Sequence, residues 1–173
     1  MTTKKLAWLE SMLLVAGLAV LVAPPAAART ICVSKTNPNC ANKIQTAIQL
    51  ALFGDTVRIQ AGTYQDTIQI PPLKRGLRVI GGQGVIIDAI SDGSPTSQQT
   101  ANAPPPVVLN QAVGIHVYAN DVQIRGLTIR GAASHGILVQ AGFSRTRILA
   151  VTIENPNGDG IRCGGACDGP LGP

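Results

Sequence analysis

Two different patterns of apolar and polar positions follow one another along the chain. Over residues 44–52 the apolar residues keep the i, i+3, i+4, i+7, i+8 spacing of one buried helix stripe. Asn42 is a suitable N-cap with Gln45 three residues on, and Gly54 is a suitable stop. We therefore predict a short amphipathic helix here. Its predicted buried residues are Ile44, Ala47, Ile48, Ala51 and Leu52.

From Asp55 the period of the pattern changes to two. Val57 and Ile59, and later Ile68 and Ile70, are apolar positions separated by a polar one. Glycines interrupt the pattern and predict strands of only three to six residues. These glycines are Gly62, Gly76, Gly81, Gly82 and Gly84.

The chain also repeats itself at a nearly constant period. Residues 124–130 (IRGLTIR) recur as residues 148–154 (ILAVTIE), and 135–139 (HGILV) recur as 159–163 (DGIRC), both after 24 positions. A period of this length predicts a repeat architecture whose single turns cannot bury their own apolar face. Leucine-rich repeats share the length, but the Leu-rich consensus and the helical half-repeat are missing. The repeats instead predict a coil of parallel strands with stacked inward Ile and Val.

Several segments resemble the right-handed parallel β-helix, or pectate-lyase-like, superfamily over residues 44–163. They are 44–48 (IQTAI), 54–64 (GDTVRIQAGTY), 77–82 (LRVIGG), 122–129 (VQIRGLTI) and the Gly-Ile strands. The resemblance implies an all-β fold, a right-handed parallel β-helix of about four turns. In that family a short N-terminal helix commonly caps the open end of the coil. We expect an N-terminal segment with this helix over 29–54, repeats over 55–163 and an irregular tail over 164–173. The polar, Pro-rich stretch 91–106 is expected to be a long loop.

Residues 1–28 are typical of a secretory signal peptide. Two lysines precede an apolar run over 12–23, which two prolines and three alanines follow. The run is shorter than the roughly 20 residues that span a bilayer, so stable membrane insertion is not expected. Cleavage after Ala28 removes two of 14 basic and one of nine acidic residues, which leaves a formal charge of 12 − 8 = +4. We therefore expect a secreted, periplasmic or cell-surface protein.

Composition agrees with a coil whose core is aliphatic. Of the 173 residues 45% are hydrophobic and only 3% aromatic, and with only 13% charged the chain is not expected to be disordered. Because the basic residues are not interleaved with aromatic ones, nucleic acid is not an expected partner.

All four cysteines lie after the signal-like segment: Cys32, Cys40, Cys163 and Cys167. In an oxidising compartment an even number favours disulfides, and three pairings are possible. The local pairing of each close pair is the simplest. Zinc is the less favoured reading because neither spacing is C-x-x-C and no histidine is near in sequence.

Alternation along the Gly-Ile strands places two candidate columns of polar side chains. His116, Leu138 and Arg162 are expected to point outward together, and His135 and Asp159 to be neighbours one turn apart. A histidine beside a carboxylate suits acid–base chemistry. Both residues equally suit a plain turn before a glycine. Our candidate catalytic residues are His135, Asp159 and Arg162.

Two enzyme classes of the superfamily bear on these residues. Residues 157–160 (NGDG) are similar to the Asn-x-Asp-Gly motif of polygalacturonases, which implies a catalytic role for Asp159, but the family's paired aspartates have no counterpart here. Pectate lyases imply calcium and an arginine base, and the acidic residues of this chain are spread out. No cofactor is therefore expected, with calcium as the alternative for a lyase.

The positive charge favours contact with an acidic polysaccharide through His116, Tyr118, Arg125, Arg130 and Arg147. We expect a secreted β-helix that binds extracellular or cell-wall polysaccharide. The alternatives are a pectin-degrading lyase or hydrolase, and a non-catalytic scaffold or truncated remnant. Because the tail has no amphipathic cap, the C-terminal end of the coil is an expected place for self-association.

Overall fold

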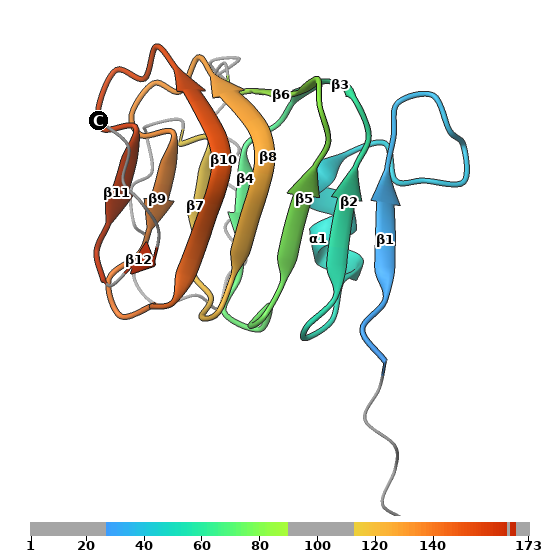
Figure 1. Ribbon diagram of the computed structural model, residues 1–173, viewed down its shortest axis with the longest axis horizontal. Coiled ribbons are helices and arrows are strands. Elements are labelled where there is room, and N and C mark those ends of the chain that lie inside the picture. The colour runs from blue at the N-terminus through green and yellow to red at the C-terminus, as the bar shows by residue number, and fades with distance from the viewer. Residues whose placement is uncertain (1–26, 90–112, 166, 169–173) are drawn as a thin grey trace, which may run out of the picture.

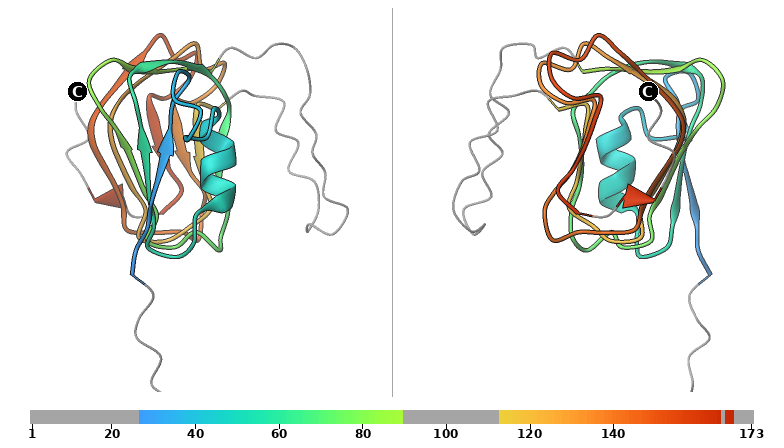
Figure 2. Two further views of the ribbon diagram at one scale, coloured as in Figure 1. Left: turned by 90° about the vertical axis from the view of Figure 1, so that its right-hand side faces the viewer. Right: turned by 60° about the vertical axis from the view of Figure 1, so that its left-hand side comes forward.

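A computed structural model describes residues 27–89, 113–165, 167 and 168. The chain winds into a right-handed parallel β-helix of about five turns, which confirms the expected fold (Figure 1 and Figure 2). The structure has one turn more than expected because β1 (Thr30–Val33), which precedes the helix, pairs in parallel with β2 (Thr56–Ile59). This rung lies before the period-two pattern begins, so the repeat does not reveal it.

The coil has three sides, each a stack of parallel strands. The first side faces the viewer in Figure 1 and continues from β1 and β2 through β5 (Arg78–Gly81), β8 (Gln123–Arg130), β10 (Thr146–Glu154) and β12 (Cys167–Asp168). The second side consists of β3 (Gly62–Gln65), β6 (Val85–Asp88) and the later halves of β8 and β10. The third side is a separate sheet of β4 (Ile68–Ile70), β7 (Ile115–Val117), β9 (Ile137–Val139) and β11 (Ile161–Cys163).

The core consists of inward aliphatic side chains stacked in columns. Val57, Val79 and Ile124 are in register on the first side and are completely buried. In the last rung the equivalent Ile148 is only partly buried, as is Ile161 on the third side. Burying one such side chain contributes roughly 1.5–3 kcal/mol. The earlier rungs are therefore better stabilised than the last one.

Single residues in the left-handed backbone region turn the chain between the sides. One column of them, with φ between 59° and 74°, leads into the first side at Gly54, Gly76, Asp121 and Arg145. Gly126 and Ala150 form a second column, with φ of 68° and 48°, within β8 and β10. Only the Gly126–Ala150 pair is missing at these bends, and the two strands pair in the same register on either side of it. The strands therefore reach eight and nine residues, longer than expected from the glycine pattern.

Helix α1 (Ile44–Leu50) lies across the N-terminal end of the coil, as Figure 2 shows. The expected cap, Asn42, is wrong: the N-cap position is Lys43, and its side chain makes no capping hydrogen bond. Asp66 fills that role from the next turn, where Oδ2 accepts the Gln45 N–H at 3.2 Å. The buried stripe is confirmed except for Leu52, which lies beyond the helix and is 59% exposed.

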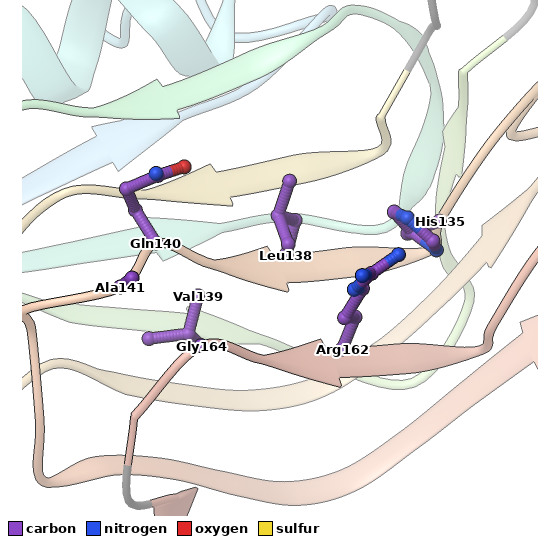
Figure 3. Close-up of a pocket in the computed structure, with 7 residues that line it drawn as sticks. All are labelled: His135, Leu138, Val139, Gln140, Ala141, Arg162 and Gly164. Carbon is purple, nitrogen blue, oxygen red and sulfur yellow. The ribbon is translucent and has the colours of Figure 1, made fainter.

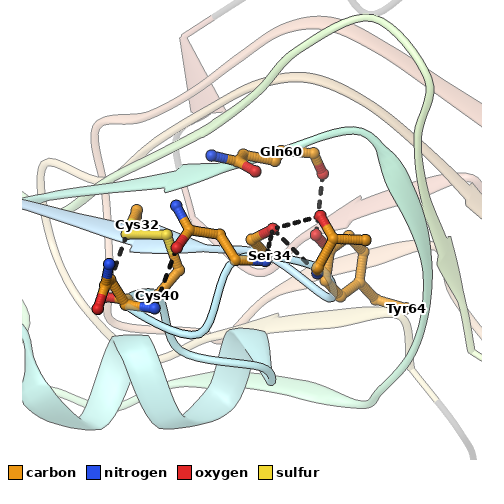
Figure 4. Close-up of a disulfide and its surroundings, with 8 residues drawn as sticks. Cys32, Ser34, Cys40, Gln60 and Tyr64 are labelled. Atoms are coloured by element: carbon orange, nitrogen blue, oxygen red, sulfur yellow. Dashed lines mark hydrogen bonds between the residues drawn. A yellow bond between two sulfur atoms is a disulfide. The ribbon is translucent and has the colours of Figure 1, made fainter.

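The two disulfides follow the local pairing, Cys32–Cys40 and Cys163–Cys167. The first closes the loop after β1, where the Ser34 hydroxyl oxygen accepts the N–H groups of two loop residues (Figure 4). Beside this loop the buried Tyr64 donates its hydroxyl to the Gln60 carbonyl at 2.9 Å. The second disulfide ties β12, a two-residue strand within the expected irregular tail, to β11.

Two expected segments fall mainly or wholly outside the described residues: the signal peptide over 1–28 and the loop over 91–106. Within the ranges that the structure describes, no helix combines the length and the apolar character needed to cross a bilayer.

Candidate functional site

A column of outward side chains follows the third side from turn to turn. Gln69, His116, Leu138 and Arg162 are register neighbours on β4, β7, β9 and β11. This confirms the predicted placement of the last three. Gln69 and Arg162, at the two ends of the column, are exposed, whereas His116 is only 2% exposed and Leu138 is half-buried. From His116 onward, the accessible polar side chain of the column is therefore that of Arg162.

His116 is held between two polar side chains. The Tyr118 hydroxyl lies 3.0 Å from Nδ1, and Gln140 Oε1 lies 3.2 Å from Nε2. The rings of His116 and Tyr118 also contact each other, with centroids 4.1 Å apart. The imidazole is thus fixed in position by both of its nitrogens.

Burial lowers the pKa of His116, although the hydrogen bond to Gln140 acts in the opposite direction. The ring is therefore neutral at pH 7. Because an amide oxygen only accepts, Nε2–H donates to Gln140 and Nδ1 accepts the hydroxyl proton of Tyr118. Burial raises the pKa of Tyr118, so the phenol keeps the proton that it donates. The result is a directed chain of hydrogen bonds from Tyr118 through His116 to Gln140.

His135 and Asp159 are neighbours on adjacent turns, as the repeat predicts. The backbone N–H of Asp159 donates to His135 Nδ1 at 3.1 Å. The carboxylate oxygen Oδ2 of Asp159 lies further away, 3.8 Å from the same nitrogen. The histidine side chain is 13% exposed and the aspartate side chain 63%. Since the Nδ1 lone pair already accepts a backbone N–H, the carboxylate does not orient this imidazole. Nε2 is the nitrogen left to meet a ligand.

A shallow open depression of about 270 Å³ lies over β9, the middle of β11 and the residue that follows β11. Figure 3 shows the guanidinium of Arg162 directed toward His135, with Gln140 at the opposite end of the depression. The full lining is His135, Leu138, Val139, Gln140, Ala141, Arg162 and Gly164. His135 and Arg162 therefore line the depression together, whereas Asp159 is not part of the lining and contacts it through His135.

The five candidate polysaccharide-binding residues lie on three different sides. His116 and Tyr118 are together on the third side. Arg125 and Arg147 are exposed on the first side, and Arg130 ends the β8 segment on the second side. There Arg130 donates to the buried carboxylate of Asp88 at 3.2 Å. These residues do not form a single surface.

Most carboxylates in the described residues are committed to structural contacts. Asp55 accepts hydrogen bonds from Arg29 and Leu52, and Asp121 accepts from Arg75 and Arg145. Asp66 caps α1 and Asp88 pairs with Arg130. Within the described ranges no three His, Cys, Asp or Glu side chains are grouped so as to hold a metal ion. Among the described contacts, Asp159 is the acidic residue that touches the lining of the depression, through His135.

Three residues of interest escape the sequence reasoning. Gln140 is the register neighbour of Tyr118, one position beyond the Val117–Val139 pair, so the repeat itself indicates its place. Arg58 and Arg78 lie on β2 and β5 in the columns that Arg125 and Arg147 occupy on β8 and β10. Extending the repeat alignment toward the N-terminus would have found them.

Comparison of the chain with protein-family models, with curated proteins and with solved structures gives no match. The likeness to pectate-lyase-like proteins therefore rests on the fold.

Proposed function

We propose that the protein is a secreted β-helix that binds extracellular or cell-wall polysaccharide on its third side. The observation that carries this proposal is the depression, whose polar lining is an imidazole, an amide and a guanidinium on adjacent rungs. A flat sheet with hydrogen-bonding groups repeated along its axis suits an extended sugar chain better than a compact ligand. The two disulfides and the signal-like N-terminal segment support an extracellular location.

Binding fits the site better than hydrolysis. Glycoside hydrolysis normally uses two carboxyl groups on either side of the scissile bond. Asp159 is next to His135 but does not line the depression, while Asp55, Asp66, Asp88 and Asp121 are engaged elsewhere. The hydrogen bond from the Asp159 backbone also occupies the His135 nitrogen that a relay would need.

A glycan-binding screen with the secreted protein tests the proposal. We expect at least one class of extended polysaccharide to bind, and Gln140→Ala combined with Arg162→Gln to weaken that binding about tenfold or more, as loss of two direct hydrogen-bonding groups implies. Thr152→Ala is a matched control, because Thr152 is an exposed polar residue of the second side. Retained affinity in the double variant, or no binding to any polysaccharide, would reject this site; the latter would leave the scaffold or remnant alternative.

A pectin-degrading activity is the second candidate, because His135 and Arg162 line the depression and Asp159 contacts His135. Incubation with polygalacturonate, with and without calcium, followed by assay for unsaturated and reducing products separates the two functions. An enzyme would release products that Asp159→Asn or His135→Ala abolishes. Product formation no higher than background under both conditions excludes it.

A further inference from the structure

The first side of the coil presents one outward arginine on each of four successive turns. They are Arg58 on β2, Arg78 on β5, Arg125 on β8 and Arg147 on β10, and all four are exposed. We call these four residues the arginine row. The row follows the coil axis on the face that Figure 1 turns toward the viewer.

Strand register fixes the spacing of the row. Arg58 and Arg125 are both in register with Ile80, whereas Arg78 and Arg147 are both in register with Gln123. Consecutive arginines therefore alternate between two columns, one rung and two residues apart. With strand spacing near 4.8 Å and a rise near 3.3 Å per residue, their Cα atoms are about 8 Å apart. Neutral residues occupy the intervening positions: Thr56, Ile80, Gln123 and Leu149.

No described side chain neutralises the arginine row. The arginines that do form ion pairs lie at the corners or on the second side. Their partners are Asp55, Asp88 and Asp121, and the arginines themselves are Arg29, Arg75, Arg130 and Arg145. Within the described part of the chain, the four row residues have neither an ion pair nor a side-chain hydrogen bond. At one end of the row Arg147 has Asp168 as its register neighbour. The other three, Arg58, Arg78 and Arg125, have no acidic register neighbour in the described strands.

We propose that the arginine row binds a linear acidic polysaccharide lying along the coil axis. The inference rests on the proposed function, from which it takes polysaccharide as the class of ligand. It adds a second binding face, on the first side of the coil, and requires a polysaccharide with repeated negative charges. Guanidinium groups form paired hydrogen bonds with carboxylate or sulfate, which suits either kind of acidic sugar. The positive charges of the row are about 8 Å apart. This spacing suits a polymer with regularly repeated negative charges better than it suits an isolated anion.

Nucleic acid fits this face less well. Proteins that bind single strands combine basic residues with aromatic side chains on which the bases stack. The two columns of the row contain Thr, Ile, Gln and Leu between the arginines and no aromatic residue. The face recognises charge without a means of holding bases.

The test compares Arg78→Gln/Arg125→Gln with Lys35→Gln/Lys43→Gln, which removes the same charge from exposed lysines at the N-terminal end. The probes are polygalacturonate, its fully methyl-esterified form, dextran sulfate, dextran and single-stranded DNA, each at two salt concentrations. We expect the arginine variant to bind polygalacturonate or dextran sulfate about tenfold more weakly and with a smaller salt dependence, because fewer counterions are released. The lysine variant should bind as the wild type does. Dextran and the methyl-esterified polygalacturonate, which lack the negative charges, should not bind to the arginine row.

Each other outcome overturns the inference. Equal loss in both variants would show attraction by net charge alone, and unchanged affinity in the arginine variant would place binding elsewhere. Binding to single-stranded DNA as tight as to the acidic polysaccharides would make the row a general polyanion surface. Failure of the proposed function is distinguishable, because then no polysaccharide binds even to the wild type. Polysaccharide binding that depends on Gln140 and Arg162 but not on the arginine row rejects only this inference.

Discussion

Glycine is required at particular places in the third side because neighbouring turns approach closely. A Cβ on Gly136 would lie 2.6 Å from Ile153 Cγ2 and 2.7 Å from the Gly160 carbonyl oxygen. The same column continues through Gly114, where a Cβ would lie 2.6 Å from the Gly136 carbonyl oxygen. At Gly160, one turn further on, the nearest atom would be 3.8 Å away. The Gly-Ile repeat therefore has a steric cause that weakens toward the last rung.

Gly136→Ala should accordingly destabilise the protein by about 1–3 kcal/mol, the usual cost of overpacking. Gly160→Ala is the matched control and should change the free energy of unfolding by less than about 0.5 kcal/mol. Urea unfolding followed by circular dichroism measures both. Equal effects at the two positions would contradict the close approach.

At Asp55 hydrogen bonds outweigh burial. Burial alone raises the pKa of this carboxyl, but donation from the Leu52 and Arg29 N–H groups and the Arg29 guanidinium lowers it below its ordinary value of 3.8. Since the folded pKa is the lower one, the contribution to stability is present above the unfolded pKa and lost as pH falls through the folded pKa.

We therefore expect the wild type to lose stability from about pH 4 downward more steeply than Asp55→Asn does. Thermal unfolding between pH 2.5 and 6 provides the comparison. Subtracting the variant separates Asp55 from Asp121, whose pKa is also lowered, by hydrogen bonds from Arg145 and Arg75. Parallel profiles for the two proteins would show that Asp55 does not titrate in this way.

At the level of elements, the helix illustrates what periodicity reveals and what it omits. Apolar spacing correctly locates α1, because the buried stripe is a property of adjacent residues. Its cap is different, since the acceptor for the Gln45 N–H is Asp66, 21 residues away. A local sequence rule finds Asn42 instead. Strand β1 is missed for a similar reason, because its pairing with β2 depends on the winding of the coil and not on the pattern of apolar residues within β1.

Asp66→Ala should cost about 1 kcal/mol of stability, as loss of an N-terminal helix cap typically does. Asp66→Asn, which keeps an acceptor oxygen, should cost less. Asn42→Ala tests the cap expected from the sequence and should have almost no effect. Chemical denaturation of the three variants distinguishes the two caps, and a larger loss for Asn42→Ala would reverse this assignment.

Across the whole molecule, the repeat predicts the columns of the candidate site but not their accessibility. The shift of 24 residues correctly places His135 beside Asp159, and Leu138 beside Arg162. It does not foresee that His116, an outward position, is buried with Tyr118 and Gln140. Exposure depends on side chains from several turns. Arg125 and His116 also lie on different sides of the coil, which the repeat period alone does not reveal.

The same dependence on neighbouring turns produces a gradient of stability along the coil. Helix α1 covers the N-terminal end, whereas Ile148, Val151, Ile153 and Ile161 of the last rung are only partly buried. In repeat proteins each unit is stabilised mainly by its neighbours. The final rung has β12 on its first side, tied to β11 by the Cys163–Cys167 disulfide.

Hydrogen exchange should reveal this gradient. We expect amides of β5, β7 and β8 to exchange most slowly and those of β11 and β12 most rapidly, because local opening costs least where burial is lowest. Cys163→Ala/Cys167→Ala should accelerate exchange in β11 and β12 and leave β2 unchanged. Uniform exchange along the coil, or an effect of the double variant on β2, would contradict a stability set by neighbouring turns.

Protein concentration provides a separate test of self-association through the last rung. Partly buried apolar side chains and a strand edge at β11 favour pairing with a second copy, whereas α1 covers the opposite end. We therefore expect slower exchange in β11 at high concentration, together with a larger mass in sedimentation velocity. Ile161→Lys should abolish both changes by placing a charge at that edge. Association that persists in this variant, or protection that appears instead at β1, would locate the contact elsewhere, because neither depends on the last rung.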